Sequence, residues 1–223
     1  MDVVALGCGD AKRETKLVEY LLQHIKKRSI KNIFALHGNF HQLSQYPLFS
    51  SGDKRTRCRV FTLLGNTLAN LDNEIRFFRD TMNAAEPGDF FVADYTQAYA
   101  SPGDPERIRE LDPPFRAGVR MAHKTWLEGP IQRYTKGARA IDLSIELTTD
   151  CLVRGSYEIA YVAKVTMEKG LTKRRFVVLR IRRYESASLS NYLARTGWAT
   201  ELNLPYGSGE RDTLRLLLLR KTL

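Results

Sequence analysis

Short apolar runs alternate with stretches of helical periodicity along the first 95 residues of the chain. Each apolar run has the length of a buried strand and ends at or beside Gly, Asn or Asp. The strand-like runs are residues 2–6, 31–36, 58–64 and 90–95, and the helical stretches are residues 12–27 and 72–84. Strands that alternate with helices predict βαβ units. We therefore expect an α/β fold with a Rossmann-like, mainly parallel sheet and helices on both faces.

The pattern changes in the second half of the chain. Residues 96–140 are rich in Pro, Gly and charge, with one helix expected at about 115–128, which indicates an insertion or cover. Residues 141–147, 157–167 and 176–183 alternate apolar and polar positions and predict an extension of antiparallel strands.

The last of these strands has a distinctive alternation. Val177, Leu179 and Ile181 are expected on one face, and Arg180 and Arg182 on the other. The sequence therefore predicts one buried face and one basic face.

The C-terminal pattern predicts a helix followed by a hairpin. The helix is expected at about 188–196 and ends at Gly197, which suits a left-handed C-cap. Strands at about 199–204 and 213–220 flank a turn rich in Pro, Gly and Ser, which predicts an antiparallel hairpin. We expect a single domain over residues 1–223, with a cofactor-binding half at 1–95, a cover at 96–140, and the antiparallel extension and terminal hairpin at 141–223.

The formal charge of +10 lies entirely in the second half of the chain. Residues 1–112 hold 15 basic and 15 acidic side chains, whereas residues 113–223 hold 20 and 10. A polyanion or a protein partner is expected to contact residues 113–223. The alternative is a solvated basic surface that keeps the protein soluble.

Membrane insertion and metal binding are both unexpected. No apolar run approaches the roughly 18 residues that span a bilayer, and the N-terminus lacks a signal-peptide pattern, so we expect a soluble, cytoplasmic protein. Cys8, Cys58 and Cys151 lack metal-ligand spacing, and His37 and His41 lack a third ligand.

The first strand ends in a loop that suits a ligand. Gly7-Cys8-Gly9 lets the backbone turn tightly before a helix, whose free amide groups favour an anionic group. A dinucleotide fingerprint would have glycine where Lys12 stands and an acid where residues 26–31 are basic. A phosphate-binding Walker loop would need a G-K-[ST] sequence, which is absent.

The motifs resemble those of class I S-adenosylmethionine-dependent methyltransferases. The resemblance rests on VVALGCGDAKRE, HGNF and FTLLGNTLANLDNEIRFFRDTMNAAEPGDFFVADY, and returns in YESASLSNYLARTGW and DTLRLLLLRK. It covers residues 2–95 well and returns over 184–221, where it matches a final helix and hairpin. More narrowly, it is similar to the branch of the histidine Nα-methyltransferases of ergothioneine synthesis.

The resemblance implies S-adenosylmethionine as cofactor and assigns residues to its parts. Asn70 matches an asparagine that positions a substrate amine. Asn39 and Phe40 match a pair that reads the adenine, and Gly65 and Asn66 match a pair beside the sulfonium. The implied cofactor-binding residues are Gly7, Gly9, Asp10, Lys12, Arg13, Asn39, Phe40, Gly65 and Asn66.

Two further residues lie where a ligand is expected. Asp94 and Tyr95 end a strand, and ligands of such sheets bind beyond the carboxyl ends of the strands, so both are candidates for substrate binding. An aspartate there is also a common loop cap. Asn66 would equally suit a turn, and Asn70 a helix cap near Asp72.

Two departures from the methyltransferase pattern bear on function. The interval between Gly9 and Asn39 holds one helix and one strand, so the strand–helix pair that would carry a ribose-binding acid is missing. Leu179 and Ile181 stand where the histidine methyltransferases place a Glu and a Ser that read imidazole, so histidine is an unexpected substrate.

Methyl transfer to an amine or another small nucleophile is the predicted function. No catalytic acid–base residue is assigned, because this chemistry depends chiefly on alignment of the reactants. The alternative is a non-catalytic relative that binds protein or nucleic acid through its basic second half.

Overall fold

A computed structural model describes residues 2–7, 32–37, 59–63, 66–135, 138–167, 173–205 and 213–222. The chain forms two compact units. One consists of residues 1–56 and 75–85, and the other of residues 57–74 and 86–223.

The first unit contains a parallel strand pair. β1 (Asp2–Gly7) pairs with β2 (Asn32–His37) in a register that joins Asp2 to Asn32 and Gly7 to His37. The parallel pairing agrees with the βαβ arrangement expected for this part of the sequence.

The helix expected over residues 72–84 is interrupted. The structure has a short turn α3 (Glu74–Arg76), a π turn η3 (Phe77–Thr81) and a 3₁₀ turn η4 (Met82–Ala84). Phe77 and Phe78 are both buried, with ring centroids 5.2 Å apart in a T-shaped arrangement. Successive residues of a regular α-helix point in directions about 100° apart, so burial of two adjacent rings is eased by a wider turn.

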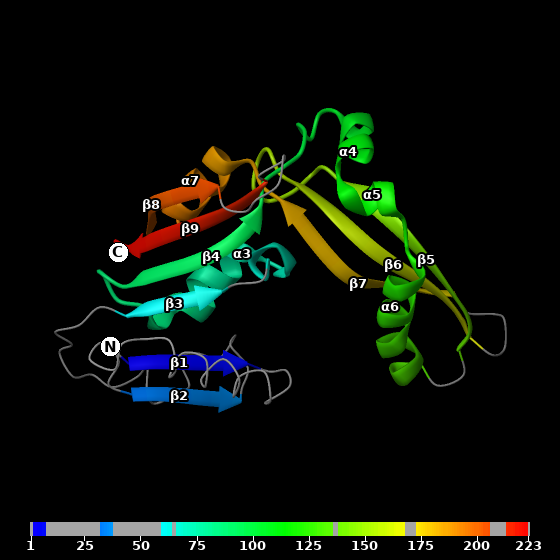
Figure 1. Cartoon of the computed structure of the whole chain (residues 1–223), viewed down its shortest axis with the longest axis horizontal. Coiled ribbons are helices and arrows are strands. Elements are labelled where there is room, and N and C mark those ends of the chain that lie inside the picture. Colours follow the sequence, from blue (N-terminus) through cyan, green and yellow to red (C-terminus); the bar gives the residue numbers. More distant parts are fainter. Residues whose placement is uncertain are drawn as a thin grey trace. The chain divides into compact units, whose positions relative to one another are not determined.

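The second unit contains a mixed four-stranded sheet in the order β3-β4-β9-β8 (Figure 1). β3 (Val60–Leu63) is parallel to β4 (Phe90–Thr96). β9 (Leu214–Lys221) is antiparallel to β4, and β8 (Trp198–Pro205) is antiparallel to β9. The two strands of this unit that were expected to be parallel, β3 and β4, are parallel, and the expected antiparallel hairpin makes the sheet mixed by placing its second strand directly beside β4.

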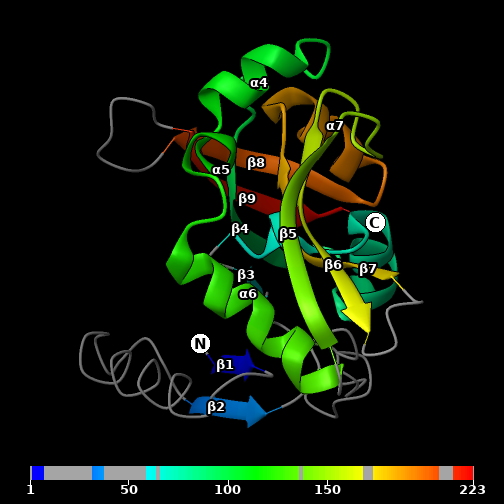
Figure 2. The same ribbon diagram turned by 90° about the vertical axis from the view of Figure 1, so that its right-hand side faces the viewer.

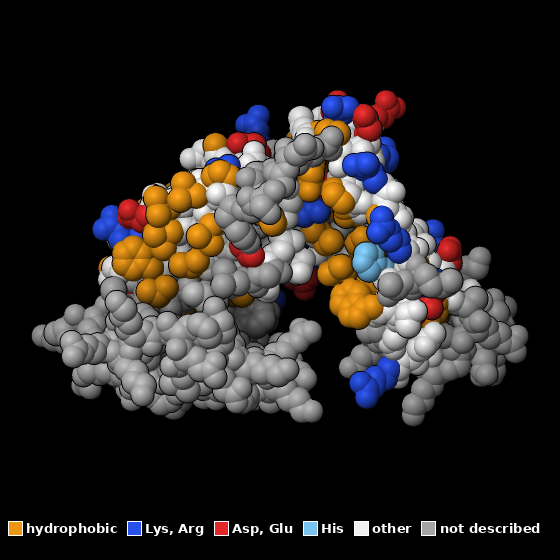
Figure 3. Space-filling view, in the orientation of Figure 1, with side chains coloured by type: hydrophobic (Ala, Val, Ile, Leu, Met, Phe, Trp, Pro, Cys, Tyr) orange, Lys and Arg blue, Asp and Glu red, His pale blue; other side chains and the backbone are white. Residues whose placement is uncertain are grey.

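The two faces of this sheet differ in burial. Phe91, Tyr95 and Leu219 lie on the covered face with exposed fractions of 1% or less. On the other face, hydrophobic side chains gather over β8 and β9 (Figure 3). Leu202, Leu204, Leu214 and Leu216 keep between 38% and 51% of their surface exposed.

α7 (Ser186–Ala194) precedes the hairpin, as expected from the sequence. Gly197 follows it with a φ of 79°. The predicted left-handed glycine at the end of this helix is confirmed.

Three antiparallel strands form a second sheet in this unit, as the alternating pattern predicts (Figure 2). They are β5 (Ala138–Thr148), β6 (Tyr157–Met167) and β7 (Lys173–Arg183).

A β-bulge changes which residues of β7 share a face of the sheet. Tyr161 pairs with Leu179, and the next residue, Val162, pairs with Val177. Successive residues of β6 face opposite sides, so Leu179 and Val177 also face opposite sides. The expectation that Val177 shares a face with Leu179 and Ile181 is wrong for this reason.

Helices from residues 96–140 cover one face of the three-stranded sheet (Figure 2). They are α4 (Pro105–Leu111), α5 (Pro113–Ala117) and α6 (Met121–Tyr134). Ile108 of α4 packs against Tyr157 and Ile159, and Ile131 of α6 packs against Ala163 and Val165. The single helix expected at 115–128 is divided at Gly118, which has a φ of 61°.

The two sheets of this unit meet where β4 and β7 end. Gln97 and Tyr184 form a parallel bridge, and the Ala98 amide donates to the Tyr184 carbonyl oxygen at 3.0 Å. The second half of the chain is thereby attached to the C-terminal end of β4.

Candidate functional site

The turn after β3 is fastened to the end of β4. Asn66 has a φ of 58°, and its main-chain N–H donates to the Asp94 carboxylate at 2.8 Å. The Asn66 side-chain oxygen accepts from the Thr96 amide at 3.2 Å and from the Thr96 hydroxyl at 3.4 Å. We call this group of Asn66, Asp94 and Thr96 the strand-end clamp.

The local sequence explains the clamp. Parallel pairing of β3 with β4 brings the C-terminal ends of both strands to one edge. Asn is among the few residues with a side chain that tolerate the left-handed region. Asp94 and Thr96 lie on the same side of β4 and are 8% and 6% exposed, so both can reach Asn66.

Asn70 ends the 3₁₀ turn η2 (Leu68–Asn70), four residues beyond Asn66. Its side chain is exposed, and the side-chain amide forms no hydrogen bond with the described residues, whereas the main-chain N–H donates to the Thr67 carbonyl oxygen at 3.0 Å. α3 begins only at Glu74, so Asn70 does not stand at the capping position of that turn. The side-chain amide of Asn70 can therefore contact a ligand.

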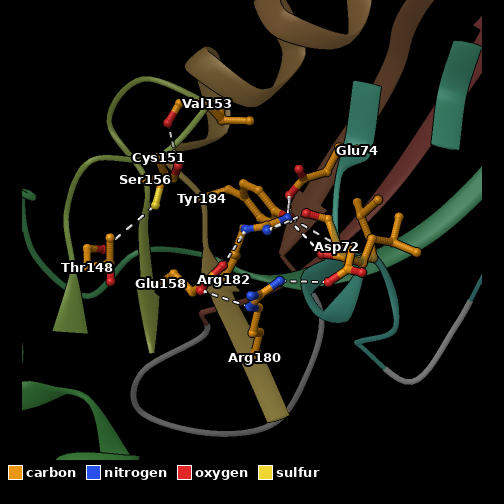
Figure 4. A network of polar contacts seen from close by, with 12 residues as sticks. Asp72, Glu74, Thr148, Cys151, Val153, Ser156, Glu158, Arg180, Arg182 and Tyr184 are labelled. Carbon is orange, nitrogen blue, oxygen red and sulfur yellow. Dashed lines mark hydrogen bonds and ion pairs between the residues drawn. The ribbon is translucent and has the colours of Figure 1, made fainter. Parts of the chain in front are cut away.

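Side chains of β7 contact residues 71–74, which directly follow Asn70 in the chain (Figure 4). The Arg182 guanidinium donates to the carbonyl oxygens of Leu71 at 2.8 Å and of Asp72 at 2.9 Å. It also contacts Glu74 at 2.5 Å and Glu158 at 3.0 Å. One buried side chain thus fixes both the main chain and the acidic side chain of this segment.

Tyr184 and Arg180 extend the same network. The Tyr184 hydroxyl donates to the Glu74 carboxylate, and its oxygen lies 3.3 Å from the Leu68 carbonyl oxygen. Arg180 contacts Asp72 at 2.6 Å and Glu158 at 3.4 Å (Figure 4).

Burial and charge set the protonation of this network. Burial raises the pKa of Tyr184 well above its ordinary value, and the Glu74 carboxylate adds to the effect, so the phenol keeps its proton and donates it. Burial alone would lower the pKa of Arg182, but Glu74, Tyr184 and Glu158 together outweigh it and the net pKa is raised. Arg182 therefore stays charged at all ordinary pH values.

The expected basic face of β7 is largely neutralised within the protein. Arg182 and Arg183 are 8% and 6% exposed, and each is paired with a buried carboxylate, Glu74 or Asp112. The expectation of an exposed basic face is therefore wrong for Arg182, whereas Arg183 lies on the opposite face with Leu179 and Ile181. The partners of both arginines lie far away in the sequence, so the pattern of β7 alone could not reveal the pairing.

Tyr95 lies next to the clamp but points into the covered face of the sheet. It is fully buried, and its hydroxyl group lies 2.9 Å from the Ser186 hydroxyl and exchanges hydrogen bonds with the Asn203 side chain. The structure therefore brings Asp94 and Asn66 together and directs Tyr95 toward α7 and β8.

Of the other predicted site residues, Gly7 is the one in the described part of the chain. Gly7 ends β1 opposite His37 of β2. The residues that lie outside the described part of the chain are Gly9, Asp10, Lys12, Arg13, Asn39, Phe40, His41 and Gly65.

Among the described residues, no three His, Cys, Asp or Glu side chains are grouped so that they could hold a metal ion. None of the described helices is long and apolar enough to cross a membrane.

No protein-family model and no curated protein sequence matches this chain. Solved structures align with it at low identity. An S-adenosylmethionine-dependent methyltransferase from Clostridium acetobutylicum aligns over 99% of this chain and 84% of its own, with 11% identity and a TM-score of 0.45. The CcbJ methyltransferase from Streptomyces caelestis aligns over 100% and 84%, with 16% identity and a TM-score of 0.41.

A third aligned structure is a 1,6-didemethyltoxoflavin-N1-methyltransferase from Burkholderia thailandensis, with bound S-adenosylhomocysteine. It aligns over 99% of this chain and 71% of its own, with 8% identity and a TM-score of 0.46. At this level of similarity, the function must be inferred from the residues of the chain itself.

Proposed function

We propose that this protein transfers a methyl group from S-adenosylmethionine to an amine or another small nucleophile. The observation that carries the proposal is the strand-end clamp at the C-terminal edge of the parallel pair β3–β4. Ligands of α/β sheets bind beyond this end of the strands. The sequence resemblance assigns Gly65 and Asn66, in the same turn, to the sulfonium end of the cofactor.

The described residues suit a sulfonium. Asp94 supplies a negative charge at the strand end, which favours a cation nearby. The amide and side chain of Asn66 are both used within the clamp, so Asn66 would contribute the shape of the turn rather than a donor group. The remaining cofactor contacts are proposed from sequence alone and are Gly7, Gly9, Asp10, Lys12, Arg13, Asn39, Phe40 and Gly65.

Methyl transfer makes modest demands on the protein. The cofactor supplies an electrophilic methyl group. The protein has to align the acceptor and exclude water. Asn70 is the proposed acceptor ligand, because its exposed amide can accept a hydrogen bond from an amine and Arg182 holds the segment behind it.

The proposed acceptor is not histidine. Leu179 and Ile181, which replace the imidazole-reading Glu and Ser in the alignment, are partly buried in β7 beside Tyr161 and Ile159. Neither side chain can form a hydrogen bond with an imidazole ring.

Calorimetric titration of the full chain with S-adenosylhomocysteine tests the cofactor assignment. We expect a Kd in the micromolar range. If binding is found, incubation with S-adenosylmethionine and a panel of amines, with S-adenosylhomocysteine release as the signal, identifies the acceptor class. Absence of heat at millimolar ligand would contradict the proposal.

The alternative function makes a different prediction for the same protein. A non-catalytic relative that binds nucleic acid through residues 113–223 should do so with an affinity that falls steeply with salt. Salt-dependent binding of RNA together with no response to S-adenosylhomocysteine would favour this alternative. A cytoplasmic location remains a prediction from the sequence.

A further inference from the structure

We infer that Asp94 is a positioning residue that acts on the cofactor through Asn66. The sequence makes Asp94 a candidate ligand contact, whereas the geometry points to a carboxylate that fixes the turn after β3. This inference rests on the proposed function, since it concerns how the same strand end receives the adenosyl compound.

The clamp joins two residues of β4 to one residue of the turn after β3. Asp94 accepts from the main chain of Asn66, and the side chain of Asn66 accepts from Thr96. Asp94 and Thr96 are both buried, so these hydrogen bonds are shielded from competing water. The turn is thus held at its main chain by one residue and at its side chain by another.

The conformation of Asn66 explains why the turn needs this support. Asn tolerates a φ of 58° better than most residues with a side chain, but the right-handed and extended regions remain open to it as well. β3 ends at Leu63, and the next turn, η2, begins at Leu68, so Asn66 lies in the connection between these two elements. Without Asp94, the connection would exchange its left-handed conformation for others.

If the turn at Asn66 lost its conformation in part of the molecules, the apparent Kd for the ligand would rise by an amount that can be calculated. When only a fraction of the protein has the binding-competent conformation, the apparent Kd rises by the inverse of that fraction. A fall in that fraction from near one to about one tenth or one hundredth gives a Kd about 10-fold to 100-fold higher.

Four variants separate positioning from charge, from stability and from the change of residue type. Asp94→Ala removes the acceptor and should raise the Kd for S-adenosylhomocysteine by about 10-fold to 100-fold. Asp94→Asn keeps an oxygen acceptor for the Asn66 amide and should stay within about 2-fold of the unmodified chain. S-adenosylhomocysteine carries no sulfonium charge, so loss of the carboxylate charge does not by itself weaken its binding.

The third variant, Leu219→Ala, controls for a general loss of stability. Leu219 is fully buried in β9, outside the clamp. At a temperature where both proteins are folded, this variant should be less stable yet keep the Kd within about 2-fold. Asp142→Ala, which removes an exposed carboxylate from β5, is the matched control for the change of residue type.

Amide hydrogen exchange gives a second readout that needs no ligand. In the unmodified protein, the amides of Asn66, Ala69 and Asn70 are all hydrogen-bonded and should be protected. Asp94→Ala should lose protection at these amides and keep it in β4 and β9. Unchanged protection would overturn the inference whether or not the ligand binds.

The outcomes distinguish the two proposals. If the unmodified chain binds S-adenosylhomocysteine and Asp94→Ala binds it equally well, the positioning role is wrong and the proposed function stands. If Asp94→Asn is as weak as Asp94→Ala, the carboxylate acts directly and the inference is again wrong. If the unmodified chain does not bind, the proposed function fails, and with it the role of the clamp in binding.

Discussion

Arg183 of β7 forms a buried ion pair with Asp112, 71 residues away in the sequence. Asp112 is fully buried and accepts from the Arg183 guanidinium at 3.0 and 3.1 Å and from the Tyr157 hydroxyl at 2.7 Å. Burial, and secondarily the Asp112 charge, raise the pKa of Tyr157 far above its ordinary value, so Tyr157 remains a donor. Arg183 and Tyr157 therefore both bind the carboxylate of Asp112.

Asp112→Asn should therefore be strongly destabilising. The change leaves the Arg183 charge buried without a counter-ion, which costs about 3–5 kcal/mol in the free energy of unfolding. Urea denaturation followed by circular dichroism measures the loss. Glu110→Gln is the control, because the Glu110–Arg107 pair at 2.6 Å is exposed and should contribute less than about 1 kcal/mol. Equal effects of the two changes would contradict this account.

The sequence could predict which residues of β7 alternate but not where its arginines bind. Arg180 and Arg182 do share a face, as expected, yet their carboxylates come from residues 72, 74 and 158. An alternating basic strand looks the same in sequence whether water or carboxylates surround it. Asn66 is a contrasting case, because its tendency toward turns was evident from the residue type.

Among the elements, α7 shows a cap that the sequence did not reveal. Glu185 accepts from the amides of Ala187 at 3.0 Å and Ser188 at 2.7 Å at the N-terminus of this helix. Hydrogen bonding to Ser188 is the main cause that lowers the pKa of Glu185, against a smaller effect of burial. The negative charge also suits the positive end of the helix dipole.

Glu185→Gln should lower stability in a pH-dependent way. Because folding lowers the pKa of Glu185 from its ordinary value of 4.5, the carboxylate stabilises the fold above that pH, and its contribution is lost as the pH falls through the lowered pKa. The variant should be less stable by about 0.5–1 kcal/mol at pH 7, and the difference should shrink toward pH 3. Urea denaturation of both proteins at the two pH values measures it. A difference that persists unchanged at pH 3 would count against the charged cap.

Elements with strong local signals were predictable, and those shaped by packing were not. Gly197 follows α7 in the left-handed conformation that was expected, because this conformation suits Gly better than residues with a side chain. The helical spacing over 72–84 predicted one helix, but burial of the adjacent Phe77 and Phe78 accompanies a π turn. Local periodicity carries no information on such crowding.

In the molecule as a whole, the sheet order places the last strand inside the sheet of the second unit. β9 lies between β4 and β8, and pairs Asp94 with Leu216 and Leu204 with Leu216. The hairpin itself was predictable from its turn residues, whereas its insertion beside β4 was not. Strand order depends on long-range pairing, which apolar patterns do not encode.

The alternation of β9 predicts a larger loss of stability from substitution of Leu219 than from substitution of Leu216. Leu219→Ala should lower the free energy of unfolding by about 2–5 kcal/mol, because Leu219 is fully buried and the change creates a cavity. Leu216→Ala should cost less than about 1 kcal/mol, because Leu216 is 38% exposed on the other face. Urea denaturation compares the two. Similar losses would mean that both faces of β9 are covered in solution.

The position of β9 also constrains the order in which the protein acquires its shape during synthesis. β4 ends at Thr96, and its antiparallel neighbour begins only at Leu214. Until the ribosome has made that neighbour, one side of β4 keeps its hydrogen-bonding groups open to other chains. A nascent chain of this protein should therefore depend on chaperones longer than one whose strands pair in the order of their translation.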